Sequence, residues 1–304
     1  MDLSGALCPV HPVVKRTVAI GCVAVVGWAA ATFLSGGAAF ADGAPKLVAA
    51  RSTTTGDSLT VSATCPRGWT AAGISAKVTG FAGVTIDEMR PDGQTAHAHA
   101  TATQPVTAEW TLQAEATCIP RTSDIEYVTA TKPGGWPGRV EVSAFCPDGK
   151  ELIGTGWTAR GGLTLTDVIA SSATGGGYPG TGANTGTGGG GQAVTHLAVA
   201  TAKAEGETGT IAVVAVCAFT GHDSQFVTGT ASRGSGPQLS APSACADGRF
   251  VYAPTMQIAG EDSTTDVMLR ELWIGSGGKA VAVTATRART GSAWLVQAGA
   301  VCSR

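Results

Sequence analysis

Short runs in which apolar and polar residues alternate recur along the chain after about residue 42. A period of two is typical of β-strands that bury one face. One set of runs leads into a cysteine: Leu59–Cys65, Val140–Cys146 and Leu239–Cys245. A second set ends at a cysteine: Cys118, Cys217 and Cys302. No stretch of ten residues after position 42 has a convincing helical stripe, so the pattern predicts an all-β fold.

The six cysteines fall at matching places, which indicates a threefold internal repeat. The first cysteine of each unit stands three residues before a glycine, in Cys65-Pro-Arg-Gly68, Cys146-Pro-Asp-Gly149 and Cys245-Ala-Asp-Gly248. A Pro-x-Gly sequence favours a tight turn. The units span about 53–125, 138–224 and 237–304.

Each unit carries further recurring positions. A small residue stands eight places after the first cysteine, at Gly73, Gly154 and Ala253, which indicates close approach of another backbone. A strand with an acidic residue follows, and then a strand rich in Thr and Ala. Trp110 and Trp294 lie eight residues before the second cysteine of their units, and we expect them in the core.

One more strand lies between units, at Tyr127–Thr131 and Phe226–Thr230, and no copy follows the third unit. A similar run, Leu47–Arg51, lies at the start of the mature chain. We therefore expect residues 47–51 to complete the third unit and close a pseudo-threefold, β-prism-like ring without an open sheet edge.

Two segments fall outside this repeat. Residues 171–192 are nearly all Gly, Thr, Ser and Ala, which predicts a flexible loop. Residues 1–41 have a basic start, an apolar stretch and Ala39-Phe40-Ala41 before Asp42, the pattern of a secretory signal peptide. An uncleaved membrane anchor is the alternative. Residues 42–304 then form a single all-β domain of three repeats, secreted to the cell exterior.

The net charge of the chain bears on its possible partners. The 304 residues carry a formal net charge of −2, which gives no reason to expect nucleic acid, or a membrane after signal cleavage.

Export and an even cysteine count favour disulfides over metal ligands. Repeat symmetry leaves two natural pairings. Pairing within units, which we favour, gives Cys65–Cys118, Cys146–Cys217 and Cys245–Cys302. Pairing across units gives Cys118–Cys146, Cys217–Cys245 and Cys302–Cys65.

Functional-looking side chains are few. Asp87, Asp167 and Asp266 recur in the three units and are candidate ligand-binding residues, although such residues more often satisfy nearby backbone N–H groups. Trp136, in a Pro-Gly-Gly-Trp-Pro loop, is a candidate for stacking on sugars. His97 and His99 share a strand face, but a metal site needs further ligands, so we expect no metal, no cofactor and no catalytic residue.

The chain resembles secreted bacterial proteins, mostly of unknown function, built from Cys-Pro-x-Gly…Trp…Cys-Ala repeats. Cys146-Pro-Asp-Gly149 and Cys217-Ala218 carry this resemblance, whereas the third unit has Ala246 for Pro and Ser303 for Ala. More distantly, the chain is similar to the β-prism of the vitelline membrane outer layer proteins. That resemblance implies a carbohydrate-associated or extracellular-matrix role.

Two function classes follow from the sequence. The first is a secreted non-enzymatic binding or surface-associated protein, with carbohydrate or a cell-surface polymer as partner. The second is an extracellular hydrolase of cell-wall or environmental polymers. A purely structural, disulfide-stapled protein is a third possibility. The absence of any recurring nucleophile or histidine favours the first.

Overall fold

The predicted all-β architecture is confirmed. The computed structural model describes residues 44–134, 138–174, 194–204, 208–219, 223–246, 248–260, 266–275, 277–288 and 291–304, and these form nineteen strands and no α-helix. They belong to one compact unit, Ala31–Arg304. The predicted signal peptide, Trp136 and most of the Gly-rich segment lie outside the described residues.

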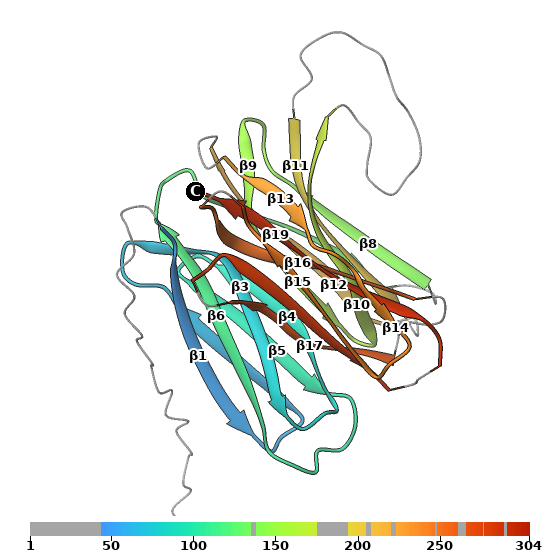
Figure 1. Cartoon of the computed structure of the whole chain (residues 1–304). Coiled ribbons are helices and arrows are strands. Elements are labelled where there is room, and N and C mark those ends of the chain that lie inside the picture. Colours follow the sequence, from blue (N-terminus) through green and yellow to red (C-terminus); the bar gives the residue numbers. More distant parts are fainter. Residues whose placement is uncertain are drawn as a thin grey trace, which may run out of the picture. The chain divides into compact units, whose positions relative to one another are not determined.

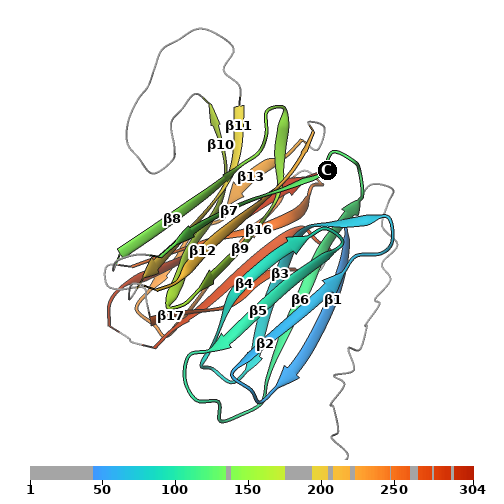
Figure 2. The ribbon, with the colours of Figure 1, turned by 180° about the vertical axis from the view of Figure 1, so that it is seen from behind.

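The strands form three open, antiparallel sheets (Figures 1 and 2). Sheet A has the order β1 (Lys46–Thr54), β6 (Trp110–Pro120), β3 (Trp69–Gly80), β17 (Val267–Ile274), β18 (Ala280–Arg287), β15 (Gln238–Ala244). Sheet B has the order β2 (Ser58–Thr64), β5 (Thr95–Ala102), β4 (Val84–Asp92), β9 (Lys150–Arg160), β12 (Thr210–Phe219), β7 (Glu126–Pro133). Sheet C has the order β13 (Gln225–Thr228), β19 (Trp294–Ser303), β16 (Phe250–Gly260), β10 (Leu163–Thr174), β11 (Val194–Ala204), β8 (Gly138–Phe145), and β14 (Ser232–Gly234) also pairs with β19.

Every sheet combines strands of two predicted units. Sheet A joins the first and third units, sheet B the second and first, and sheet C the third and second. Within each sheet the joint is short: β17 meets β3 through Glu271–Lys77 and Leu272–Ala76. The corresponding joints are β4 with β9 and β10 with β16. No unit therefore completes a sheet by itself.

The N-terminal strand has a different partner from the one we predicted. Leu47–Arg51 lies in β1, which pairs with β6 of the first unit from Lys46–Cys118 to Thr54–Trp110. The reason is visible in the other sheets, where β7 and β13 each precede a unit and pair with the second-cysteine strand of the unit that follows. β1 thus completes the first unit, and the prediction that it completes the third is wrong.

Three disulfides join the cysteines within units, which confirms the pairing that we favoured. They are Cys65–Cys118, Cys146–Cys217 and Cys245–Cys302. In each unit the first cysteine directly follows a strand of one sheet and the second lies in a strand of another. The three bonds therefore tie sheet B to A, C to B and A to C. In the chain-entropy model, loops of this length each contribute roughly 4 kcal/mol.

The turn after each first cysteine is the same in all three units. Its glycine has a positive φ, 82° at Gly68, 81° at Gly149 and 75° at Gly248. The next residue donates its N–H to the carbonyl three positions back, from Trp69 to Pro66, for example. This is the geometry of a turn that requires glycine at its third position.

The strands that follow these turns approach each other closely. β3, β9 and β16 each pair across a β-bulge, which leaves Ala72, Ile153 and Tyr252 without a paired residue. These three side chains are buried together in a small second core. An added Cβ would lie 2.1 Å from the Tyr252 carbonyl oxygen at Gly73 and 1.7 Å from the Ala72 carbonyl oxygen at Gly154. The predicted close approach of another backbone is confirmed at both glycines.

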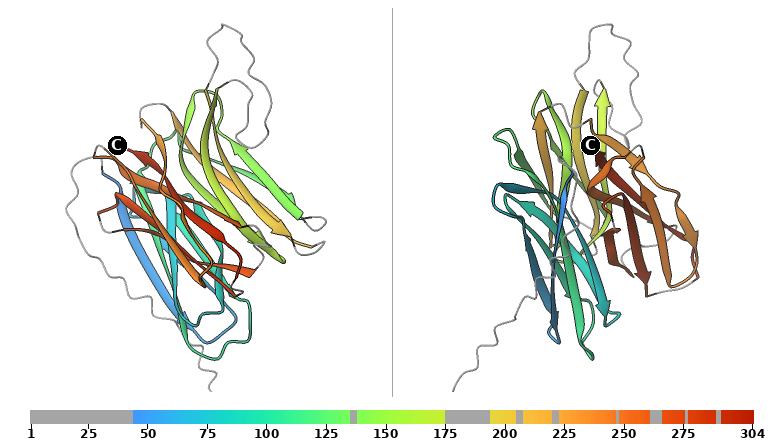
Figure 3. Two further views of the ribbon diagram at one scale, coloured as in Figure 1. Left: turned by 45° about the vertical axis from the view of Figure 1, so that its right-hand side comes forward. Right: turned by 60° about the vertical axis from the view of Figure 1, so that its left-hand side comes forward.

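The larger core lies between the sheets (Figure 3). Trp110 and Trp294 are fully buried in it, as predicted, and each indole N–H donates to a loop carbonyl, of Gly56 and of Gly236 respectively, at 2.9 Å. Residues 171–174, which we predicted as the start of the Gly-rich loop, belong to strand β10, and residues 175–193 lie outside the described part of the chain.

The close packing of β9 on β3 predicts a strong effect of one methyl group. Gly154→Ala places its Cβ against backbone, which cannot move away as a flexible side chain would, so we expect a loss of at least 1–3 kcal/mol in the free energy of unfolding, roughly the cost of overpacking. Urea titration followed by tryptophan fluorescence measures it.

Gly236→Ala is the matched control, since an added Cβ there meets nothing closer than 3.9 Å. Equal stability of the two variants would contradict the proposed role of the contact.

Candidate functional site

The three predicted aspartates do not occupy equivalent positions. The first residue after each bulge in β4, β10 and β17 is acidic and pairs with the neighbouring unit: Glu88, Asp167 and Glu271. Asp87 is the bulged residue itself, and Asp266 precedes β17. The prediction of three equivalent aspartates is therefore wrong, because the number of residues between the first cysteine and this bulge differs from unit to unit, so that equal sequence spacing does not mark equal positions.

Asp87 is half-buried and fully engaged by the neighbouring strand β5. One carboxylate oxygen lies 2.5 Å from Nδ1 of His99, and the other accepts a hydrogen bond from the Thr101 hydroxyl at 2.6 Å. His99 thus orients Asp87. His97 lies on the same face and contacts the Ser62 hydroxyl through its own Nδ1 at 2.8 Å.

Asp167 is buried, with 4% of its surface exposed, and has partners of its own. The Thr166 hydroxyl donates to it at 3.0 Å and the Arg139 guanidinium at 3.4 Å. Burial raises the pKa of the carboxyl, and the contacts with Thr166 and Arg139 act in the opposite direction. These contacts give Asp167 a structural role. It lines none of the cavities described below.

Asp266 is held by a bifurcated contact from one guanidinium N–H. The Arg287 Nε lies 3.1 and 3.2 Å from its two carboxylate oxygens. The Arg287 side chain is almost fully buried, with 6% of its surface exposed, so the pair is fixed in position.

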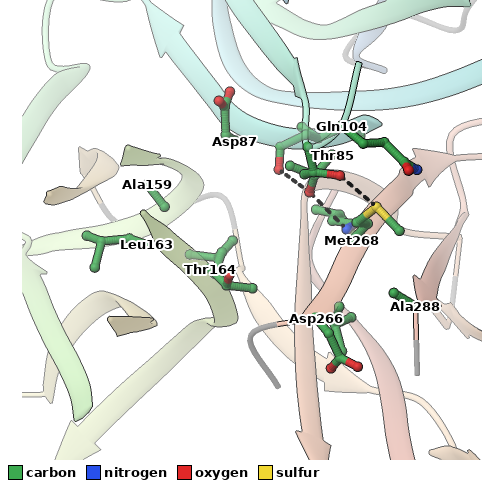
Figure 4. A pocket seen from close by; sticks show the side chains of 14 residues that line it. Thr85, Asp87, Gln104, Ala159, Leu163, Thr164, Asp266, Met268 and Ala288 are labelled. Atoms are coloured by element: carbon green, nitrogen blue, oxygen red, sulfur yellow. Dashed lines mark hydrogen bonds between the residues drawn. The ribbon is translucent and has the colours of Figure 1, made fainter. Parts of the chain in front are cut away.

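Asp87 and Asp266 line opposite sides of one cavity, which we call the three-unit pocket (Figure 4). It has a volume of about 260 Å³ and is lined by strand ends of all three units. Its polar groups are the Thr85, Thr103 and Thr164 hydroxyls, the Gln104 amide and the two carboxylates. Its apolar wall is formed by Ile86, Leu163, Leu165, Val267, Met268 and Leu269.

Part of this polar lining is already committed to the fold. The Thr85 hydroxyl accepts a hydrogen bond from the Leu269 backbone N–H at 3.1 Å, which ties the first unit to the third. The Thr103 hydroxyl donates to the Gly83 carbonyl at 3.2 Å. Gln104 is exposed and its amide makes no hydrogen bond to the described residues. The pocket thus offers one free amide and several fixed oxygen atoms that a ligand hydroxyl can approach.

The arrangement suits binding better than acid–base chemistry. A glycosidase needs two carboxyl groups that face each other across the bond to be cleaved, one of them as a proton donor. Asp87 accepts a hydrogen bond from Thr101 at one oxygen and contacts Nδ1 of His99 with the other, and Asp266 is held by a guanidinium. Neither is placed to donate a proton. Among the described residues no group of three or more His, Cys, Asp or Glu side chains is arranged to hold a metal ion.

One carboxyl group outside the pocket is strongly perturbed. Burial on sheet A raises the pKa of Glu115 to about 7, against the opposing charge of Lys77. One oxygen of Glu115 is buried without a hydrogen-bond partner, and so are the hydroxyls of the adjacent Ser75 and Thr117. No sequence pattern indicates this burial, because a single Glu in an alternating strand is typical of a solvent-facing position.

No protein-family model matches the chain, and no curated protein matches its sequence. Within the part of the chain that the structure describes, no helix has the length and apolar character that crossing a membrane requires. The three disulfides indicate folding in an oxidising, extracellular environment.

Sequence reasoning found two of the pocket residues, Asp87 and Asp266, but not Thr85, Thr103 or Gln104. Single Thr and Gln residues at strand ends carry no recognisable motif. The pocket arises only because three units that are distant in sequence bring their strand ends together, which the repeat alone does not specify.

The raised pKa of Glu115 predicts a pH-dependent stability. The folded state binds the proton more tightly than the unfolded state, so its contribution is fully present below about pH 4.5 and is lost as the pH rises through about 7. Relative to Glu115→Gln, the wild-type protein should lose stability across this window by up to about 3 kcal/mol. Thermal unfolding of both proteins from pH 4 to 8 measures the difference.

Glu109→Gln serves as control, because Glu109 is fully accessible on a loop. A constant difference between wild type and Glu115→Gln across the pH range would contradict the assignment.

Proposed function

We propose that this is a secreted, non-enzymatic binding protein with a pseudo-threefold β-prism arrangement, and that the three-unit pocket holds a small neutral polar ligand, with a sugar residue of a larger glycan as the first class to test. The observation that carries the proposal is the pocket itself: a hollow lined by hydroxyls, an amide and two fixed carboxylates over an apolar wall. Alternating hydroxyl and C–H surfaces of a sugar match such a lining.

The prism arrangement is supported by the strand orders. Each sheet has the same order of strands. It begins with an edge strand, continues with the strand that holds the second cysteine and the strand that follows the Cys-x-x-Gly turn, and ends with three strands of another unit. Consecutive strands β1 and β2 lie in different sheets and contact each other, and β7–β8 and β14–β15 do the same. These three contacts are the corners of the proposed prism, and the disulfides lie between the same pairs of sheets. The resemblance to the β-prism of the vitelline membrane outer layer proteins is part of the same proposal.

The size of the pocket sets the size of the ligand. Its volume of about 260 Å³ is below the range of roughly 300–1,000 Å³ for drug-sized ligands, so it holds a single ring rather than a chain. Isolated sites of this kind bind weakly, on the order of millimolar, about −4 kcal/mol. A polymer that offers many such rings gains avidity from several protein molecules or sites.

Secretion is part of the proposal. The disulfides require an oxidising compartment, and the sequence of residues 1–41 has the pattern of a signal peptide. A polysaccharide outside the cell is then the polymer that the protein meets first.

Binding of the mature protein to a glycan array and to insoluble polysaccharides tests the proposal. Ala288→Trp introduces a large ring at an exposed residue that lines the pocket and should abolish binding there. Gln104→Leu removes the free amide and should weaken binding about 2- to 10-fold, the value of one neutral hydrogen bond.

Gln238→Leu is the matched control for the amide, since Gln238 is also exposed but lies on the edge strand β15, away from the pocket. Unchanged binding in Ala288→Trp would remove the pocket from the proposal. Turnover of a polysaccharide or peptide by the purified protein would favour the hydrolase alternative.

A further inference from the structure

A second candidate site lies on sheet C, between β10 and the short edge strand β13. Two cavities occupy this space, of about 110 and 510 Å³, and both are lined by Ala170 and Phe226. They therefore form one continuous depression, which we call the sheet C groove. Its floor at the smaller cavity comes from β16 and β19, and its larger end is reached at His196 and Ser224.

We infer that the sheet C groove binds a short stretch of a neutral oligosaccharide. This site shares no residue with the three-unit pocket, and the inference does not depend on that pocket being functional.

One residue that lines the groove differs between the three sheets. The residue three positions before the second cysteine is Glu115 in sheet A, Val214 in sheet B and Gly299 in sheet C. A Cβ at Gly299 would lie 2.4 Å from the Thr255 hydroxyl and 2.9 Å from the Val227 carbonyl oxygen. The Thr255 side chain and the β13 backbone thus lie so close to Gly299 that any other residue would displace them. β13 is also shorter than its counterparts, with four residues against nine in β1 and eight in β7.

The lining is neutral and rich in groups that both donate and accept hydrogen bonds. None of the residues that line either cavity is Asp, Glu, Lys or Arg. Burial lowers the pKa of His196, so its imidazole is neutral at physiological pH. The remaining polar groups are hydroxyls and amides, including those of Ser171, Ser172, Gln225 and Gln257. The nearest charge is that of Glu151, which accepts a hydrogen bond from the Ser224 backbone N–H at 3.3 Å and acts on His196 against the effect of burial. The lining itself is uncharged, and it matches the hydroxyls of a sugar chain.

Two of these groups lack a partner. Nδ1 of His196 and the hydroxyl oxygen of Ser224 are buried without any hydrogen bond. Buried polar atoms in that state are uncommon and call for an explanation. Both residues line the larger cavity, so a rotamer change at Ser224 or a ring flip at His196 presents the atom to a ligand hydroxyl.

An aromatic surface completes the site. The half-buried Phe226 ring lies 5.8 Å from the His196 ring, inclined at 60°. The apolar face of a sugar ring packs against such a surface while its hydroxyls reach the polar rim. An extended peptide that pairs with the edge strand β13 is the competing occupant, and the experiment below includes a peptide for this reason.

Saturation-transfer NMR with the full mature protein tests the inference. The probes are β-1,4-linked trisaccharides of glucose and of N-acetylglucosamine, with a neutral Ala/Ser hexapeptide as the peptide arm. We expect at least one trisaccharide to bind and the hexapeptide not to bind. Changing His196→Ala together with Ser224→Ala should weaken trisaccharide binding at least tenfold.

The control is Ser62→Ala with His97→Ala, which makes the same two chemical changes in a Ser–His pair on sheet B. A measurement on the unaltered protein does not depend on folding of any variant: the His196 Cε1–H resonance should shift on addition of the trisaccharide, and that of His97 should not.

Failure of both trisaccharides to shift the His196 signal, binding that survives the His196 and Ser224 substitutions, or binding of the hexapeptide instead would each overturn the inference. Ala288→Trp separates the two sites, because it should leave the His196 shift unchanged. A lost His196 response with binding intact at the three-unit pocket would refute the groove alone, and the reverse result would refute the pocket alone.

Discussion

The close contact of β3, β9 and β16 is the constraint on which the rest of this structure depends. The carbonyl oxygens of Tyr252 and Ala72 occupy the space that side chains at Gly73 and Gly154 would need. A bulge in each strand turns Ala72, Ile153 and Tyr252 into the same small core. Because backbones pack so tightly there, the sheets have little freedom to shift relative to one another.

The disulfides reinforce this arrangement from another position. Each bond joins two different sheets, so the three together link every sheet to both of the others. Reduction of Cys65–Cys118, for example, would release sheet B from sheet A. The contact of β3, β9 and β16 fixes the packing of the sheets, and the disulfides lower the conformational entropy of the unfolded chain. A protein with few charged side chains and many Ala, Gly and Thr residues thereby gains stability that large apolar side chains supply elsewhere.

Local patterns predicted much of the fold but not its long-range pairings. Alternation located the strands around the cysteines, and Gly73 and Gly154 were found from spacing alone. The predicted pairing of Leu47–Arg51 with the third unit was wrong, because the alternation of apolar and polar residues does not indicate which strands are neighbours in a sheet. The equivalence of Asp87 and Asp266 with Asp167 failed for another reason: all three strands carry the same bulge, but the chain between the first cysteine and that bulge differs in length from unit to unit. Both candidate sites escaped prediction, since each is assembled from strands distant in sequence.

The three units are alike in backbone but not in what they expose. Glu115, Val214 and Gly299 stand at matching positions: the first is a largely buried carboxyl group, the second a buried apolar side chain, and the third lines the sheet C groove. A symmetric protein with three equal sites would keep one residue type at such a position. The substitutions here instead leave the shared backbone intact and change only the surface that each sheet presents. The scaffold thus tolerates divergence wherever the central contact and the cysteines are preserved, and binding sites are to be sought at the asymmetric positions rather than at the repeated ones.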